Sequence, residues 1–285
     1  MEKSFFSELY YKAFQSGNRL HLLIAINTII FLALGILSLV DFFAKTGIAS
    51  LLVTQLSLPA NLGDLLYRPW SLVTYMFTQL AFFHFLFNML WLYWIGIIFL
   101  DFLNNRQFIF TYLLGGLAGG ALFLALYNLI PSIASGPAVL IGSSGAVYAI
   151  VVATATLAPN YTIRLLFFGN VRLKYLVAAF IVLNILGLNG ANLGGNLAHL
   201  GGALMGFIYI KQLRNGNDWS KLFKPRKTKL RIVKNHTATT NKTSFTNQEY
   251  IDSILDKISQ SGYNSLSKAE KEALFNAGKQ DSNQK

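Results

Sequence analysis

The chain has 285 residues, of which 53% are hydrophobic and 13% are charged, and its mean hydropathy is +0.45. A soluble globular domain carries about 25% charged residues, so this composition excludes an ordinary soluble protein and indicates a polytopic membrane protein. The net charge is +12, and the sequence has no cysteine, which excludes disulfides, thiol nucleophiles and thiolate metal sites.

The N-terminal segment, residues 1–19, contains acidic residues and lacks an apolar run that ends in a small-residue cleavage site. We therefore expect neither a secretory signal nor a transit peptide. The large apolar residues of this segment fit one face of a short helix that lies at the membrane interface. These residues are Phe5, Phe6, Leu9, Tyr10 and Phe14.

Four stretches of the sequence contain no Asp, Glu, Lys or Arg, and they cover residues 20–40, 69–100, 107–163 and 175–210. A helix that crosses about 30 Å of hydrocarbon needs about 20 residues, so the first two stretches hold one helix each. The third is interrupted around residues 131–137 and the fourth by a Gly/Asn-rich run, so each holds two helices. The sequence therefore predicts an all-α bundle of six transmembrane helices within residues 20–213, near 20–42, 82–102, 107–129, 144–158, 175–188 and 196–213.

The basic residues are unevenly divided between the two sides of this bundle. If the N-terminus is inside, 22 Lys and Arg residues lie in cytoplasmic segments, and the outer loops carry Lys45 and Arg68. The positive-inside rule therefore favours cytoplasmic termini. Because no transit peptide is found and the plan is compact, we expect an integral protein of a bacterial plasma (inner) membrane.

The fourth predicted helix is short, because about 15 residues from Ser144 onward rise only roughly 22 Å. If its inner end lies at the cytoplasmic interface, its N-terminus opens inside the bilayer, where free N–H groups need protein or water as partners. That N-terminus reads Gly142-Ser143-Ser144-Gly145. Small residues at such a place are most often a packing surface. The alternative is a serine beside backbone N–H groups that stabilise an oxyanion.

Two histidines are predicted at the same depth as this serine. His84 opens the second helix with Asn88 one turn later on the same face, and His199 lies near the start of the sixth helix. A lone buried histidine is as often packed against a carbonyl as functional, but four polar groups at one depth indicate a site. Histidine is the usual base for serine near neutral pH. Tyr148, one turn after Ser144, is expected to hold the imidazole by stacking, and helices four to six offer no carboxylate as a third member.

Glycines are placed where the fourth and sixth helices must approach each other. Gly202 and Gly206 form a G-x-x-x-G pattern one turn after the second histidine, and Gly145 with Ala146 provides a small partner face. We interpret these residues as scaffold.

Together these motifs resemble the rhomboid family of intramembrane serine proteases, over about residues 65–213. The resemblance is carried by an H-x-x-x-N motif, a G-x-S-G motif, a tyrosine four residues after the serine, and an Ala-His pair followed by two glycines. The key residues are His84, Asn88, Ser144, Tyr148 and His199.

The resemblance implies a Ser–His dyad that cleaves peptide bonds in or near transmembrane segments. Ser144 would be the nucleophile and His199 the general base and then acid. The side chains of His84 and Asn88, with the backbone N–H of Ser144, would form the oxyanion hole. Many relatives carry a histidine where this chain has Gln79, and we expect that difference to matter little. The loop at 44–70 corresponds to the lipid-embedded first loop of the family.

The sequence after the sixth helix is basic, with nine Lys and Arg and one acidic residue in residues 211–234. Beside a cytoplasmic helix end this favours attraction to anionic lipid over binding of nucleic acid. We expect a basic juxtamembrane linker at 214–247 and a small helical module at 248–285. In the module, Ser267 with Glu270 predicts a capping box, and four apolar residues follow the helical period: Ile251, Ile254, Leu255 and Ile258.

Three functions compete on this evidence. An active protease would cut single-span membrane proteins and would need neither a cofactor nor a metal ion. A non-cleaving rhomboid-like protein would bind transmembrane helices, but such proteins usually lack the serine or the histidine. An unrelated six-helix transporter is disfavoured, because we find no internal repeat and the polar groups cluster toward the outer side.

Overall fold

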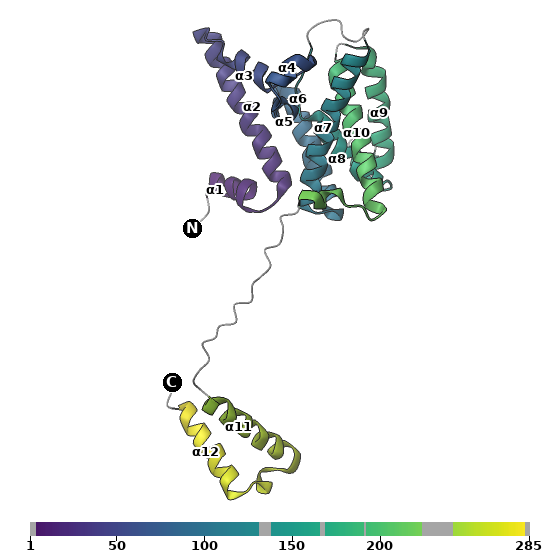
Figure 1. Ribbon diagram of the computed structural model, residues 1–285. Coiled ribbons are helices and arrows are strands. Elements are labelled where there is room, and N and C mark those ends of the chain that lie inside the picture. Colours follow the sequence, from purple (N-terminus) through teal and green to yellow (C-terminus); the bar gives the residue numbers. More distant parts are fainter. Residues whose placement is uncertain (1–3, 131–137, 166–168, 191, 224–241, 283–285) are drawn as a thin grey trace. The chain divides into compact units, whose positions relative to one another are not determined.

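The computed structural model describes residues 4–130, 138–165, 169–190, 192–223 and 242–282, and these are mostly helical. The chain divides into two compact units, Met1–Lys224 and Pro225–Lys285 (Figure 1).

The first unit contains the long apolar helices that the charge-free stretches predict. Four of them are long and apolar enough to cross a membrane, and they are α2 (Arg19–Ala44), α6 (Phe82–Phe102), α7 (Asn105–Leu129) and α10 (Leu193–Arg214). Two shorter apolar helices accompany them, α8 (Ser144–Leu157) and α9 (Leu173–Leu186). The four candidate spans and the apolar composition indicate an integral membrane protein.

Helix α8 occupies the centre of this unit and packs against α6, α7, α9 and α10 (Figure 1). Its contact with α10 brings backbone atoms of the two helices close together. A Cβ built on Gly202 would lie 1.9 Å from the carbonyl oxygen of Gly145, and one on Gly206 would lie 2.3 Å from that of Ala149. Only glycine fits at such a distance, so the predicted small-residue faces of these two helices do meet.

The long segment between α2 and α6 folds into short elements that brace the start of α8. They are α3 (Ile48–Leu56), β1 (Leu58–Pro59), α4 (Leu62–Tyr67), α5 (Ser71–Thr74) and the 3₁₀ turn η2 (Tyr75–Phe77). Strand β1 pairs antiparallel with β2 (Val139–Leu140), which precedes α8. The indole N–H of Trp70 donates to the carbonyl of Gln55 at 2.9 Å, and the Arg68 guanidinium donates to that of Thr54.

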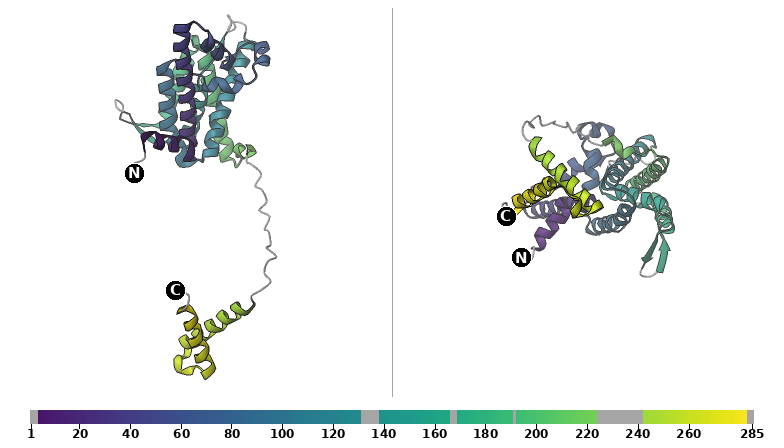
Figure 2. Two further views of the ribbon diagram at one scale, coloured as in Figure 1. Left: turned by 90° about the vertical axis from the view of Figure 1, so that its left-hand side faces the viewer. Right: turned by 90° about the horizontal axis from the view of Figure 1, so that it is seen from below.

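The prediction of an all-α fold is correct for the helices and misses two small sheets. Besides β1–β2, the segment between α8 and α9 forms a hairpin of β3 (Thr162–Leu165) and β4 (Gly169–Arg172). Figure 2 shows this hairpin projecting from the helices. Strands of four residues that carry arginines are too short to produce a clear period-2 hydrophobic pattern, so the sequence read as a charged loop.

The N-terminal segment is helical, as its apolar pattern predicts. It forms α1 (Phe5–Tyr10) and a π-helical turn, η1 (Tyr11–Gln15). The side chains of Leu9, Tyr10 and Phe14 are exposed, as an interfacial helix requires.

The residues that follow α10 fold back onto the helices instead of leaving directly as a linker. The carboxylate of Asp218 is buried and accepts hydrogen bonds from the Arg106 guanidinium at 3.2 Å and the Tyr209 hydroxyl at 3.1 Å. A 3₁₀ turn, η4 (Trp219–Phe223), follows it. The first ten residues of the predicted linker at 214–247 therefore belong to the folded unit, because one buried acid organises them.

The second unit contains α11 (Lys242–Ser261), the turn η5 (Tyr263–Ser265) and α12 (Lys268–Ser282), with α11 and α12 in contact. The backbone N–H of Ser267 donates to Glu270 Oε2 at 2.7 Å, and the N–H of Glu270 donates to Ser267 Oγ at 3.3 Å, which confirms the capping box. Helix α11 begins six residues before the predicted module boundary at 248. The Ser, Thr and Asn residues there cost a helix only tenths of a kcal/mol each (about 0.5).

Candidate active site

The start of α8 carries the candidate nucleophile. Gly142 has φ +117°, a conformation that other residues rarely adopt, and its N–H donates to the carbonyl of Tyr75 at 2.9 Å. This turn places Ser144 at the first position of the helix, where it is 7% exposed. The first N–H groups of a helix have no acceptor within the helix. At the start of α8 they can therefore donate hydrogen bonds to a negatively charged oxygen.

The side chains of Ser144 and His199 meet across the contact between α8 and α10. The distance from Ser144 Oγ to His199 Nε2 is 2.7 Å. The backbone contact at Gly202 lies less than one turn after His199 and holds the two helices at this separation.

A third side chain, Asn184 of α9, completes the group, and it was not predicted from the sequence. Its Oδ1 lies 2.7 Å from His199 Nδ1, and its Nδ2 donates to the backbone carbonyl of Asn196 at 2.8 Å. A carbonyl only accepts, so the amide nitrogen must face Asn196 and the amide oxygen must face the imidazole. Nδ1 of His199 therefore carries the proton, and Nε2 is left to accept a hydrogen bond from the Ser144 hydroxyl.

The aromatic ring of Tyr148 lies flat against the imidazole of His199. The ring centroids are 4.3 Å apart and the planes differ by 5°, which is the stacking that its position one turn after Ser144 led us to expect. The ring blocks one face of the imidazole and restricts its rotation.

His84 and Asn88 lie one turn apart on α6, beside this group. A Cβ built on Gly142 would lie 3.0 Å from His84 Cε1 and 3.8 Å from Ser144 Oγ, so the imidazole and the hydroxyl flank the same glycine. Asn88 is buried, and its Nδ2 donates to Gln79 Oε1 at 2.8 Å. All five predicted site residues thus lie at the α6–α8–α10 junction, where Ser144, His199 and Tyr148 are in direct contact.

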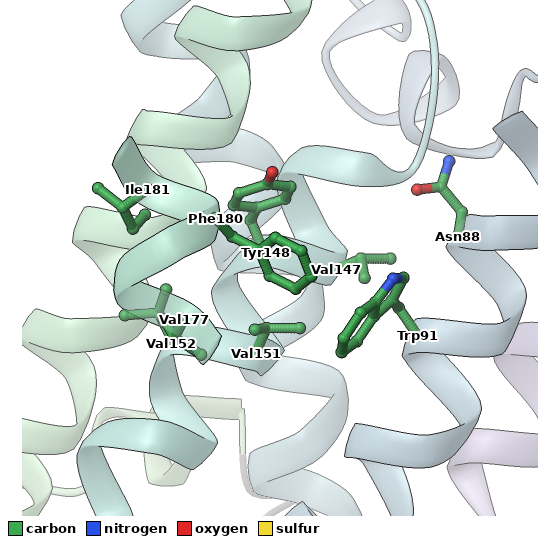
Figure 3. A pocket seen from close by; sticks show the side chains of 9 residues that line it. All are labelled: Asn88, Trp91, Val147, Tyr148, Val151, Val152, Val177, Phe180 and Ile181. Carbon is green, nitrogen blue, oxygen red and sulfur yellow. The ribbon is translucent and has the colours of Figure 1, made fainter. Parts of the chain in front are cut away.

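A cavity of about 140 Å³ opens next to the group, between α6, α8 and α9 (Figure 3). Its walls are mostly aliphatic and aromatic, and its lining residues are Asn88, Trp91, Val147, Tyr148, Val151, Val152, Val177, Phe180 and Ile181. The rings of Trp91 and Phe180 meet edge to face with centroids 4.7 Å apart, which joins α6 to α9 across the cavity.

Comparison with known proteins identifies the family. No curated protein matches the chain. Residues 238–279 match a family of unknown function (DUF6576). Residues 67–215 match the Rhomboid domain, whose family is known for intramembrane proteases. That match spans just over half of the chain and includes every residue of the candidate site, and the chain therefore belongs to the rhomboid family.

Proposed function

We propose that the protein is an intramembrane serine endopeptidase, which cleaves peptide bonds in or near the transmembrane segments of single-span membrane proteins. The observation that carries this proposal is the 2.7 Å contact between Ser144 Oγ and His199 Nε2, with the opposite imidazole nitrogen held by Asn184. A nucleophile, a base and a group that orients the base are the parts that acyl transfer requires.

The chemistry follows from the tautomer. His199 Nε2 removes the proton from the Ser144 hydroxyl as Oγ attacks the scissile carbonyl carbon, and Asn184 Oδ1 holds the Nδ1 proton. The imidazolium then gives the Nε2 proton to the leaving amine, and the C–N bond breaks to leave an acyl-serine. A water molecule, deprotonated by the same Nε2, then attacks the ester carbonyl. The ester C–Oγ bond breaks, Nε2 returns its proton to Ser144 Oγ, and the acid product leaves.

The negative charge on the carbonyl oxygen has donors at the start of α8. We assign the backbone N–H of Ser144, the His84 imidazole and the Asn88 amide to this oxyanion hole. The positive end of the α8 dipole lies at the same point. Loss of one such donor typically slows turnover by about 10²–10³-fold.

The cavity beside Tyr148 suits a small substrate side chain near the bond that is cut. An apolar cavity of about 150 Å³ holds a molecule the size of benzene, and this one is of similar volume. A substrate helix that arrives from the lipid must part the Trp91–Phe180 contact, so we propose that α9 moves during substrate access.

The proposed arrangement in the membrane completes the function. α8 and α9 join the four longer helices in a six-helix domain at residues 20–213, with an interfacial segment at 1–19. The uneven distribution of basic residues supports cytoplasmic termini, and it supports contact between the basic segment after α10 and anionic lipid. The compact six-helix plan favours a bacterial inner membrane. The helical module that follows lies on the cytoplasmic side.

Labelling by a fluorophosphonate probe tests the proposal, combined with cleavage of a single-span reporter in proteoliposomes. The parent is expected to be labelled and to cut the reporter, and Ser144→Ala to do neither. Ser143→Ala is the matched control, because Ser143 is a buried serine directly next to Ser144, and this variant should keep the label. A folded parent that is neither labelled nor active would instead indicate a non-cleaving binder of transmembrane helices.

A further inference from the structure

A chain of buried amide side chains runs from the candidate oxyanion hole to the first long helix. Asn88 Nδ2 donates to Gln79 Oε1 at 2.8 Å, and Gln79 Nε2 donates to Asn27 Oδ1 at 3.1 Å. Gln79 lies in the extended segment before α6, and Asn27 lies on α2. Both side chains are at most 1% exposed, so water does not compete for these hydrogen bonds.

The direction of this chain is fixed at its far end. Asn27 Nδ2 donates to the backbone carbonyl of Leu23 at 2.9 Å and to the Tyr112 hydroxyl at 3.2 Å. Because a carbonyl cannot donate, Asn27 must turn its nitrogen toward Leu23 and its oxygen toward Gln79. Gln79 must then present its nitrogen to Asn27 and its oxygen to Asn88. Each amide is thus oriented by the one before it.

This orientation determines which atom Asn88 offers to the site. Its nitrogen gives one hydrogen to Gln79, and no second acceptor for that nitrogen lies among the described residues. Figure 3 shows the Asn88 nitrogen pointing away from Trp91, with the amide oxygen on the side of Tyr148. A flipped amide would set its oxygen against Gln79 Oε1, so Gln79 opposes the flip.

We propose that Gln79, oriented by Asn27, is a positioning residue that holds the Asn88 amide with its free N–H available to the oxyanion at Ser144. The proposal rests on the proposed protease function, which it deepens. It also contradicts our expectation from the sequence that Gln79 would matter little. If the amides only fasten α2 to the bundle, their loss should lower thermal stability and leave kcat per folded molecule unchanged.

The test compares kcat and KM of the full-length protein on a single-span reporter in proteoliposomes. Gln79→Met keeps the side-chain length and removes both hydrogen bonds. We expect kcat to fall about tenfold with little change in KM, a smaller loss than the 10²–10³-fold expected for removal of the donor itself in Asn88→Ala. In the Asn88→Ala background, Gln79→Met should have no further effect, because it acts through Asn88.

Gln107→Met is the matched control. Gln107 is also buried, and its amide also makes two hydrogen bonds, to the N–H of Asn104 and to Asp218. It lies at the start of α7, beside the C-terminal end of α6, whereas Asn88 lies near the N-terminal end of α6, roughly 21 Å away along the helix at 1.5 Å per residue. This variant should lose thermal stability while kcat per folded molecule stays at the parent value.

Asn27→Leu provides a second variant, on α2 and away from Ser144. It removes the group that orients Gln79, so kcat should fall in the same direction by a smaller factor, again with no effect in the Asn88→Ala background. Unchanged kcat in folded Gln79→Met, or losses that multiply with that of Asn88→Ala, would overturn the positioning role. A parent that cuts nothing would instead refute the protease function, so the two failures are distinguishable.

Discussion

Asn184 and His199 are joined by a 2.7 Å hydrogen bond that links α9 to α10 and decides which nitrogen of the imidazole carries the proton. The bond gives an amide the position that a carboxylate holds in a serine triad. An amide supplies orientation without bringing a negative charge into the apolar interior, where an unpaired carboxylate is costly.

Asn184→Leu removes the acceptor for Nδ1 and should lower kcat by about 10–100-fold, because the imidazole then samples the wrong tautomer and orientation. Asn184→Asp keeps an acceptor in the same place and should retain more activity than Asn184→Leu. Reporter cleavage in proteoliposomes measures both, with folding checked by thermal unfolding. Equal activity of Asn184→Leu and the parent would remove Asn184 from the mechanism.

Gly202→Ala should disrupt the contact between α8 and α10. The added Cβ would lie 1.9 Å from the carbonyl oxygen of Gly145, so the helices must separate and Ser144 must leave His199. We expect a loss of about 1–3 kcal/mol in stability together with a loss of fluorophosphonate labelling.

The control is Gly35→Ala on α2, where a Cβ would meet nothing within 4 Å. It should leave labelling intact and the melting temperature equal or slightly higher, since alanine favours a helix over glycine. If Gly202→Ala had the melting temperature and the fluorophosphonate labelling of the parent, close contact between the α8 and α10 backbones would not be required.

Phe180→Ala should increase the rate of reporter cleavage, if the ring contact with Trp91 limits substrate access. Removing the phenyl ring opens the edge of the cavity between α6 and α9, and a faster opening step raises turnover when opening is rate-limiting. Leu183→Ala is the control, because this side chain on α9 is 63% exposed and does not line the cavity. A slower Phe180→Ala enzyme would place substrate access elsewhere.

The helical module should lose stability in acid through Glu270. The Lys257 ammonium, followed by the N–H and hydroxyl of Ser267, lowers the pKa of Glu270 from 4.5 to about 2. A carboxyl whose pKa is lower in the folded state stabilises that state fully above its unfolded pKa, and this contribution disappears as the pH falls from about 4.5 to 2. The protection of α12 amides against hydrogen exchange in the full-length protein, taken relative to the intrinsic exchange rate at each pH, should therefore fall over that range. In Glu270→Gln this pH dependence should be absent.

The long helices and the serine–histidine contact were predictable because their signals are local and strong. A charge-free stretch of sufficient length predicts a transmembrane span, however the helices pack against one another. Around Ser144 and His199, the sequence combines a helix start, a base and small residues at one depth. The capping box of Ser267 and Glu270 is likewise set by residues three apart in sequence.

Other features depend on contacts that the sequence does not display. Asn184 is a neutral amide in an apolar run, and its position at the depth of the histidine is the only mark of its role in the sequence. The hydrogen bond of Gln79 to Asn27 joins residues that are 52 positions apart in the sequence. The β3–β4 hairpin and the fold-back at Asp218 likewise arise from tertiary pairing, which propensity does not report.

The backbone contact between α8 and α10 also has a consequence for biosynthesis. The chain is made from its N-terminus, so Asn88, Ser144 and Asn184 enter the membrane before His199. Under the proposed function, the Ser144 hydroxyl would therefore stay without its base until α10, the last long helix of this unit, is released and packs its glycines against α8. A partly synthesised or wrongly inserted chain would then be inert toward the membrane proteins around it, and cleavage would report that the whole unit has been assembled.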